Sequence, residues 1–169
     1  MKKVSLVSVL ILLFFYTLLG QNELEQKQLR EKKSKIEYTQ IKKLVESKLY
    51  KFEVQRVSRV RSSPINFMGE GYYLTVTKDS VNTHLPYFGV RHSGGGSGES
   101  SGIEFNGLME NYKVEYDDSK KRIIVKFIGR NTGESLDITL SIFKNGSSQL
   151  SVRSSHRSSM NYSGKLIKS

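Results

Sequence analysis

The chain of 169 residues contains no cysteine. Without thiols it can form no disulfide and no thiolate-ligated metal site. Attachment to a membrane through a lipidated N-terminal cysteine is excluded for the same reason. The fold must therefore be held by a packed core, or by a metal bound without thiols.

Histidine is nearly as scarce, with only His84, His92 and His156 in the chain. No two of them have the close spacing of a helical metal-binding motif. A metal site assembled in space from His92, Glu99 and Glu104 is conceivable. A lone, solvated side chain is the preferred interpretation for each histidine, and we predict no metal.

The motifs of common enzyme classes are missing as well. The glycine-rich run at 94–98 lacks a following Gly-Lys-Ser/Thr and leads into a predicted strand, whereas a phosphate-binding loop needs a helix N-terminus behind it. No Gly-x-Ser-x-Gly is present, and Ser97 lies in a predicted flexible loop. The paired acids Asp117 and Asp118 are typical of an exposed turn. We therefore expect no enzyme and no cofactor.

The first residues have the order of a secretory signal peptide. Lys2 and Lys3 give a positive start, residues 4–19 are almost wholly apolar, and Gly20 is a small residue at their end. An uncleaved membrane anchor is the alternative, but this run is shorter than the ~20 residues that a membrane-crossing helix needs. We predict a signal peptide over 1–20. Either interpretation exports the rest of the chain to the periplasm or the extracellular space, as a soluble protein if cleavage occurs near Gly20.

Positive charge dominates the rest of the chain. The full sequence has 27 Lys+Arg against 16 Asp+Glu, a net charge of +11, and loss of Lys2 and Lys3 leaves +9. Residues 21–61 hold twelve of the basic residues and six of the acidic ones. This excess could attract phosphates, acidic glycans or anionic lipids, but a solvated basic surface is the preferred interpretation. Export makes nucleic acid a poor candidate partner.

A helix is predicted over about residues 22–48. Residues 21–35 are nearly all polar and form a predicted helical spacer. From Ile36 onward, apolar residues recur at helical spacing, so the second half of the helix should dock on the domain, which we place at 36–169.

After Tyr50 the hydrophobic period changes to alternation. Alternating or short apolar segments recur up to about Leu166, and Asn145-Gly146 marks a tight hairpin turn. The predicted fold class is α+β. The N-terminal helix would pack on one face of a single, mainly antiparallel sheet of about eight short strands, which could be curved.

Residues 83–89, Thr-His-Leu-Pro-Tyr-Phe-Gly, precede the glycine-rich loop. The preferred interpretation is structural: Pro86 and Gly89 shape a bend, and Leu85, Tyr87 or Phe88 anchors it in the core. The alternative is a partly exposed aromatic shelf that binds a ligand, with Tyr87, Phe88 and Arg91 as the candidate ligand-binding residues. The basic, hydroxyl-rich stretch at 153–159 could hold a sulfate or phosphate, but a solvated connection is preferred.

Several segments resemble the domain of unknown function 4251 family over about residues 38–167. They are Phe52-Glu53-Val54, Ile65-Asn66-Phe67, Tyr73-Leu74-Thr75-Val76, Leu85-Pro86-Tyr87-Phe88-Gly89, Gly102-Ile103-Glu104-Phe105, Leu150-Ser151-Val152, Arg157-Ser158 and Tyr162-Ser163-Gly164. Such proteins are typically exported by Bacteroidetes, often as lipoproteins, and this chain departs from that form in having no cysteine. The resemblance implies fold and compartment, and it assigns no activity.

Three candidate functions are compatible with these patterns. The first is an exported, non-catalytic domain that binds a ligand or envelope component, an anionic one being an option. The second is a hydrolase of envelope polymers, which needs convergent acids or a Ser–His pair gathered in space. The third is a membrane-surface or assembly factor that uses the basic helix at 27–48.

Overall fold

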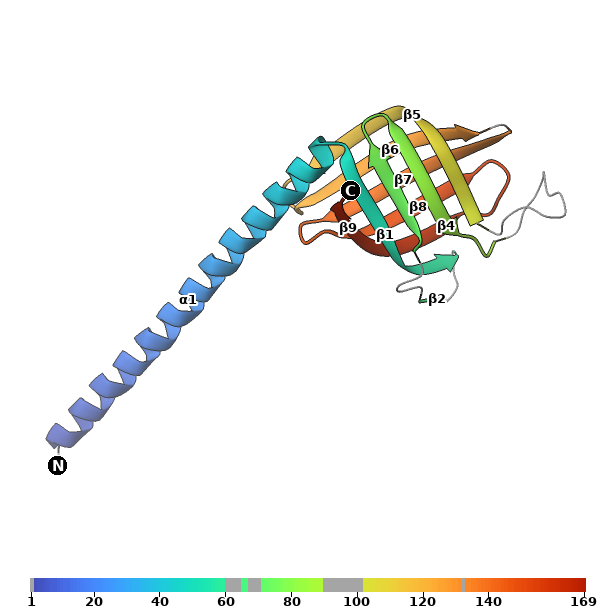
Figure 1. Cartoon of the computed structure of the whole chain (residues 1–169). Coiled ribbons are helices and arrows are strands. Elements are labelled where there is room, and N and C mark those ends of the chain that lie inside the picture. Colours follow the sequence, from blue (N-terminus) through green and yellow to red (C-terminus); the bar gives the residue numbers. More distant parts are fainter. Residues whose placement is uncertain (1, 60–64, 67–70, 90–101, 132) are drawn as a thin grey trace. The chain divides into compact units, whose positions relative to one another are not determined.

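The computed structural model describes residues 2–59, 65–66, 71–89, 102–131 and 133–169 (Figure 1). They fall into two units. The first extends to Glu37, and the second is Tyr38–Ser169. The second unit contains all nine strands that the structure describes.

Helix α1 (Lys2–Glu46) is longer than the predicted helix, because it also includes the residues of the predicted signal. It ends where Lys48 takes the left-handed conformation, with φ 51°, and the N–H of Ser47 donates to the carbonyl of Lys43 at 3.0 Å. Within the described residues, no helix has the combined length and apolar character that crossing a membrane requires.

The strands follow α1 in unbroken antiparallel order. They are β1 (Leu49–Arg59), β2 (Ile65–Asn66), β3 (Tyr73–Thr77), β4 (Ser80–Pro86), β5 (Gly102–Asp117), β6 (Arg122–Asn131), β7 (Glu134–Phe143), β8 (Ser147–Ser154) and β9 (Met160–Lys168). Strand β3 pairs with β1, and each of β4 to β9 pairs with the strand before it. The short strand β2 pairs with β1 at Arg56 and Val57.

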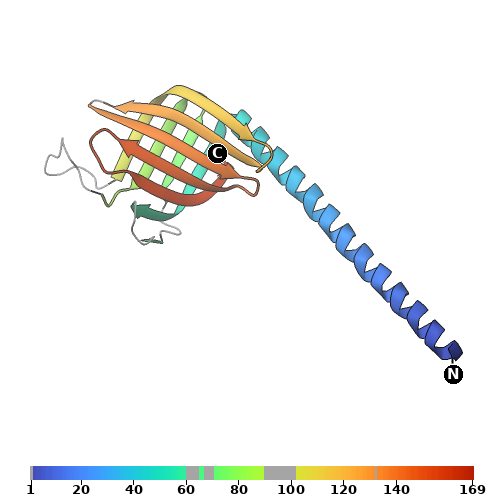
Figure 2. The same ribbon diagram turned by 180° about the vertical axis from the view of Figure 1, so that it is seen from behind.

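The predicted antiparallel sheet is confirmed, but it is not merely curved, because it closes into a barrel of eight strands. Strand β9 pairs with β1 from Tyr50↔Lys168 to Arg59↔Met160, which joins the last strand to the first (Figures 1 and 2). A bulge between Val54 and Arg56 interrupts this register. Bulges bend a strand and increase its twist, as a closing sheet requires. Closure gives every barrel strand two partners and removes the open edges of a flat sheet.

Strand β5 is a single strand of 16 residues. It joins the two short apolar segments around 103–105 and 112–116, which the sequence pattern alone does not connect. Its pairing with β6 shifts register between Glu110 and Lys113, and Asn111 there has φ 55°. The polar break at Glu110-Asn111 is therefore an irregularity within a strand, and it does not end the strand.

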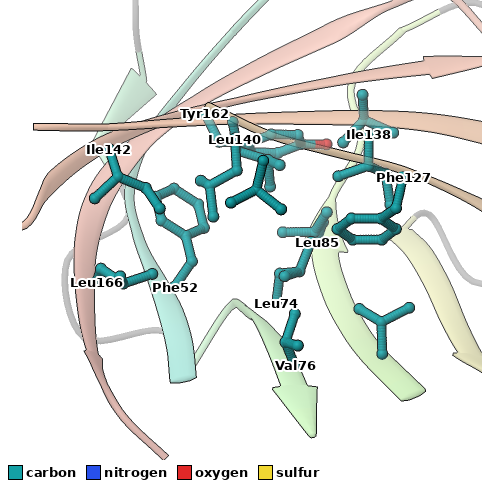
Figure 3. Packing of buried hydrophobic residues seen from close by; sticks show 14 of the residues in the cluster. Phe52, Leu74, Val76, Leu85, Phe127, Ile138, Leu140, Ile142, Tyr162 and Leu166 are labelled. Carbon is teal, nitrogen blue, oxygen red and sulfur yellow. The ribbon is translucent and has the colours of Figure 1, made fainter. Parts of the chain in front are cut away.

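The core fills the inside of the barrel (Figure 3). The predicted alternation is confirmed: Phe52 in β1 and Leu74 in β3 have no exposed surface, and Leu140 in β7 has none either. In Figure 3 these side chains point toward one another from different strands. Burying such side chains contributes about 1.5–3 kcal/mol each, which replaces the disulfides that the chain cannot form.

The last turns of α1 cover one end of the barrel, which we call the helix end. Val45 is fully buried, and the hydroxyl of Tyr38 donates to Asp118 Oδ1 at 2.9 Å in the β5–β6 turn. Lys42 Nζ lies 2.6 Å from the same carboxylate oxygen. Docking of the second half of the helix is thus confirmed, but it covers an end of the barrel and not a face of an open sheet.

Candidate functional site

Tyr87 lies just beyond β4, at the end of the barrel opposite the helix end, which we call the far end. Its side chain is half-buried, and its hydroxyl accepts a hydrogen bond from the N–H of Ser158 at 3.1 Å. The guanidinium carbon of Arg157 lies 5.5 Å from the centre of its ring. These contacts join the residue after β4 to the connection between β8 and β9. They give Tyr87 the anchoring role of the preferred structural interpretation.

Arg157 is not solvated, contrary to what its stretch of sequence suggested. Its side chain is 10% exposed, and it donates to Glu134 Oε2 at 3.0 Å and to the carbonyl of Gly102 at 2.7 Å. Ser154 donates a further hydrogen bond to Glu134, whose side chain is 15% exposed. Because a carboxylate already neutralises this guanidinium, Arg157 is a poor receptor for a sulfate or phosphate. Sequence alone could not foresee this, because Glu134 lies 23 residues away.

Of the other residues proposed to bind a ligand or metal, the structure describes some and not others. Phe88 is 45% exposed. Arg91 lies outside the described residues, so the grouping of Tyr87, Phe88 and Arg91 as a binding site stays a prediction. His92 and Glu99 also lie outside the described residues, and so does Ser97. Among the residues that are described, no three His, Cys, Asp or Glu side chains come together as metal ligands.

A hollow that the sequence did not reveal lies on the outside of strands β3, β4 and β5, which Figure 1 draws in green to yellow. We call it the outer groove. Its volume is about 350 Å³, and it is lined by Tyr73, Asn82, Thr83, His84, Glu104, Phe105 and Asn106. The register of the three strands brings these residues together from positions more than 30 residues apart.

His84 occupies the middle of this arrangement. It pairs across the sheet with Tyr73 on one side and Glu104 on the other, and its Nδ1 lies 3.4 Å from Glu104 Oε1. Its ring stacks on Tyr72 with centres 5.1 Å apart and lies 6.2 Å from the ring of Tyr73. His84 is therefore not the lone side chain that the sequence suggested, but it is solvated as expected, because 45% of the side chain is exposed.

The amides of the outer groove lie one step further along the same strands. Asn82 in β4 pairs directly with Asn106 in β5, two residues from the His84–Glu104 pair. Side chains two residues apart on a strand point to the same face. The groove thus presents two amides, a carboxylate and an imidazole beside the ring of Tyr73. In these strands apolar residues alternate with polar ones. The apolar positions predicted the core, and the polar positions between them were the only sequence signal for this groove.

A second hollow, of about 360 Å³, lies over β7, β8, β9 and β1. It is lined by Ser58, Thr139, Ser141, Gln149, Leu150, Ser151, Asn161, Tyr162 and Ser163. Its lining is rich in hydroxyls and amides but includes no charged side chain among the described residues. The only ring in that lining is Tyr162, which is buried and donates to the carbonyl of Pro86 at 2.9 Å. This hollow offers a matched control surface for the outer groove.

Comparison with known proteins gives a family and a fold. Residues 32–166 match the family described as Domain of unknown function (DUF4251). The chain is similar to a crystal structure of a DUF4251 family protein from Bacteroides eggerthii DSM 20697, with a TM-score of 0.63 and 16% sequence identity. The match covers 79% of this chain and 88% of that one, and at this identity it shows the fold alone. No curated protein matches the chain.

Proposed function

The chain belongs to the DUF4251 family, a domain of unknown function, and from the geometry of its barrel we propose that it is an exported, non-catalytic binding domain. Its ligand, a component of the cell envelope, occupies the outer groove. The observation that carries this proposal is the combination of a filled interior with a polar, aromatic-lined hollow on the outside of the barrel.

Two features support the outer groove as the binding surface. Ligand sites are concave, lined by aromatic and apolar groups with a few converging polar side chains, and they occupy ~300–1,000 Å³. The groove lies near the lower end of that range, at about 350 Å³, and it combines the rings of Tyr73 and Phe105 with converging polar side chains, although its lining is more polar than that of most ligand sites. Phe88 lies two residues beyond β4, the strand that carries His84, and is 45% exposed, so we propose that Phe88, with Tyr87 beside it, extends the surface at the far end.

The exposure of the His84–Glu104 pair supports binding over catalysis. The two side chains are 45% and 54% exposed, so water weakens the electrostatic interactions that they can make. Enzymes gain most from charges and dipoles fixed in a site that excludes water. A hydrolase using this pair is the second candidate, because these are the converging histidine and carboxylate that hydrolysis would need. Turnover of an envelope polymer that is abolished in Glu104→Gln would replace the binding proposal.

A membrane-surface role for the basic helix has less support. Lys42 lies 2.6 Å from Asp118, and Lys48 lies 2.8 Å from Asp79. Two lysines of the predicted basic patch are thus already paired with acids of the barrel, and fewer charges remain to attract an anionic membrane.

Export is proposed from the order of residues 1–20. Mass spectrometry of the native protein should give a mature N-terminus close to Gln21. A native protein that retains Met1 or Lys2 would mean that the segment stays attached as an anchor.

Hydrogen–deuterium exchange of the full chain, with and without the solubilised envelope fraction of the producing cell, tests the proposed site. We expect slower exchange in 73–84 and 102–106, and loss of that protection in Asn82→Ala. Asn161→Ala, an equivalent change in the second hollow, is the control and should leave the protection unchanged. Protection confined to β7–β9, or no protection anywhere, would contradict the proposal.

A further inference from the structure

We infer that the outer groove takes a neutral, polyhydroxylated ligand, namely a segment of oligosaccharide roughly one or two sugar residues long. This inference rests on the proposed function and specifies the chemistry of its ligand. Three properties of the groove support it: its charge, its rings and the positions of its amides.

The charge of the lining argues against an anionic ligand. The chain carries 27 Lys+Arg, yet none of the described residues that line the groove is basic apart from His84. Lys51 approaches the ring of Tyr73 at 5.2 Å, but its ammonium lies 3.0 Å from Glu53 Oε1 and is paired there. Glu104 adds a negative charge that would repel phosphate, sulfate or uronate groups.

The rings offer what a sugar needs on its apolar face. A pyranose has one face of C–H groups, and these pack against the electron-rich face of an aromatic ring. Tyr73 is half-exposed in the groove, with its ring tilted 46° to that of His84. The ring of Tyr72 stacks on that of His84 at an angle of 25°, which restricts the orientation of the imidazole. These ring contacts are present without a ligand, so less conformational entropy is lost on binding than for isolated side chains.

The amides and the carboxylate offer what a sugar needs at its edge. Asn82 and Asn106 can both donate and accept, as each hydroxyl of a sugar can, and Glu104 accepts from two hydroxyls at once. Neighbouring strands lie ~4.8 Å apart, and same-face residues along a strand lie ~6.6 Å apart. The polar groups are therefore spaced over an area comparable to one sugar ring.

The test is titration of the full chain with neutral gluco-, manno- and chito-oligosaccharides and with a sulfated oligosaccharide of equal length, followed by saturation-transfer NMR. We expect at least one neutral oligosaccharide to bind and the sulfated one to bind more weakly. Asn106→Ala should weaken binding about tenfold, since a lost hydrogen bond costs ~1.4 kcal/mol. Tyr73→Phe should keep binding, because the ring remains, while Tyr73→Leu should lose it. Asn161→Ala should bind as the unmodified chain does.

Preferred binding of the sulfated oligosaccharide would overturn the inference, and so would neutral binding that Tyr73→Leu leaves unchanged. If no neutral oligosaccharide binds but the envelope fraction still protects 73–84, the ligand class is wrong and the proposed function stands. If neither occurs, both fail. A thermal melt of each variant ensures that lost binding is not lost folding.

Discussion

Substitution of Gly164 by alanine tests the closure of the barrel directly. Gly164 lies in β9, where it pairs with Val54 of β1 and Ser148 of β8. A Cβ at this position would lie 1.8 Å from the carbonyl oxygen of Glu53 and 3.0 Å from the ring of Phe52. Real Cβ atoms essentially never approach another atom closer than 3.0 Å, so β1 must move away from β9 by about 1 Å or more.

The expected cost depends on the contacts that this movement breaks. Overpacking costs ~1–3 kcal/mol and occasionally more, and loss of one or two hydrogen bonds between β1 and β9 adds ~0.5–1.5 kcal/mol each. The sum of about 3–4 kcal/mol is a large part of the ~5–15 kcal/mol that stabilises a typical domain. Each kcal/mol corresponds to ~2–8 °C in domains of this size range, so the melting temperature should fall by roughly 10 °C or more.

Thermal unfolding of the full chain, followed by far-ultraviolet circular dichroism, measures this effect. Ser163→Ala is the matched control, because Ser163 is the exposed neighbour on the same strand and its change should alter the melting temperature by less than about 2 °C. If Gly164→Ala lowers the melting temperature no more than Ser163→Ala does, closure of the barrel is refuted. In an open sheet, β9 would be an edge strand with no β1 carbonyl against which to clash.

Three further outcomes are expected. Tyr162→Phe removes a buried donor from the carbonyl of Pro86 and should destabilise the fold by ~1–3 kcal/mol in urea unfolding, whereas a change below ~0.3 kcal/mol would mean that water replaces the bond. Arg157→Met leaves Glu134 nearly buried without its ion-pair partner and should cost ~3–5 kcal/mol in the same urea unfolding. The double variant Arg157→Met/Glu134→Leu should regain most of this stability. No recovery would show that the unpaired carboxylate is not the cause. Burial raises the pKa of Tyr50 and Tyr162 above the ordinary 10.0. The neutral phenols therefore stabilise the folded state. This contribution to stability is complete below about pH 10 and is lost as the pH rises further. Tyrosinate absorbance should then show a group of phenols that ionise only as the chain unfolds, and a titration complete near pH 10 with the fold intact would contradict this.

Asp118, at the helix end, makes stability depend on pH in the opposite direction. Hydrogen bonds from Lys42 and Tyr38 hold the pKa of Asp118 below its ordinary value of 3.8. A lowered pKa favours the folded state above the ordinary value, and that contribution is lost as the pH falls below 3.8. Both ends of the pH range thus weaken the fold through different groups. Acid acts on the docking of the last helical turns, and alkali acts on the buried phenols of the barrel.

Much of the fold could be predicted because it depends on local pattern. The alternation at 136–142 predicts buried residues on one side of a strand, and all four apolar residues there are at most 2% exposed. Asn145-Gly146 predicts a turn, and Gly146 has φ 79°. The candidate site was harder to predict from the sequence. Leu-Pro-Tyr-Phe-Gly at 85–89 drew attention to Tyr87, while the neighbouring His84 was set aside because no second ligand or partner stood near it in sequence.

The sequence by itself determined the period of each element, the residues that face the core, the family and the proposed export segment. These are properties of neighbouring residues, and side-chain chemistry records them directly. Only the tertiary structure decided that β1 pairs with β9, that Glu134 neutralises Arg157, and that Tyr73, His84 and Glu104 share one groove. The physical reason is that strand pairing is made by backbone hydrogen bonds, which are the same for every residue except proline. The register that brings distant side chains together is set by packing of the whole barrel, so no short stretch of sequence displays it.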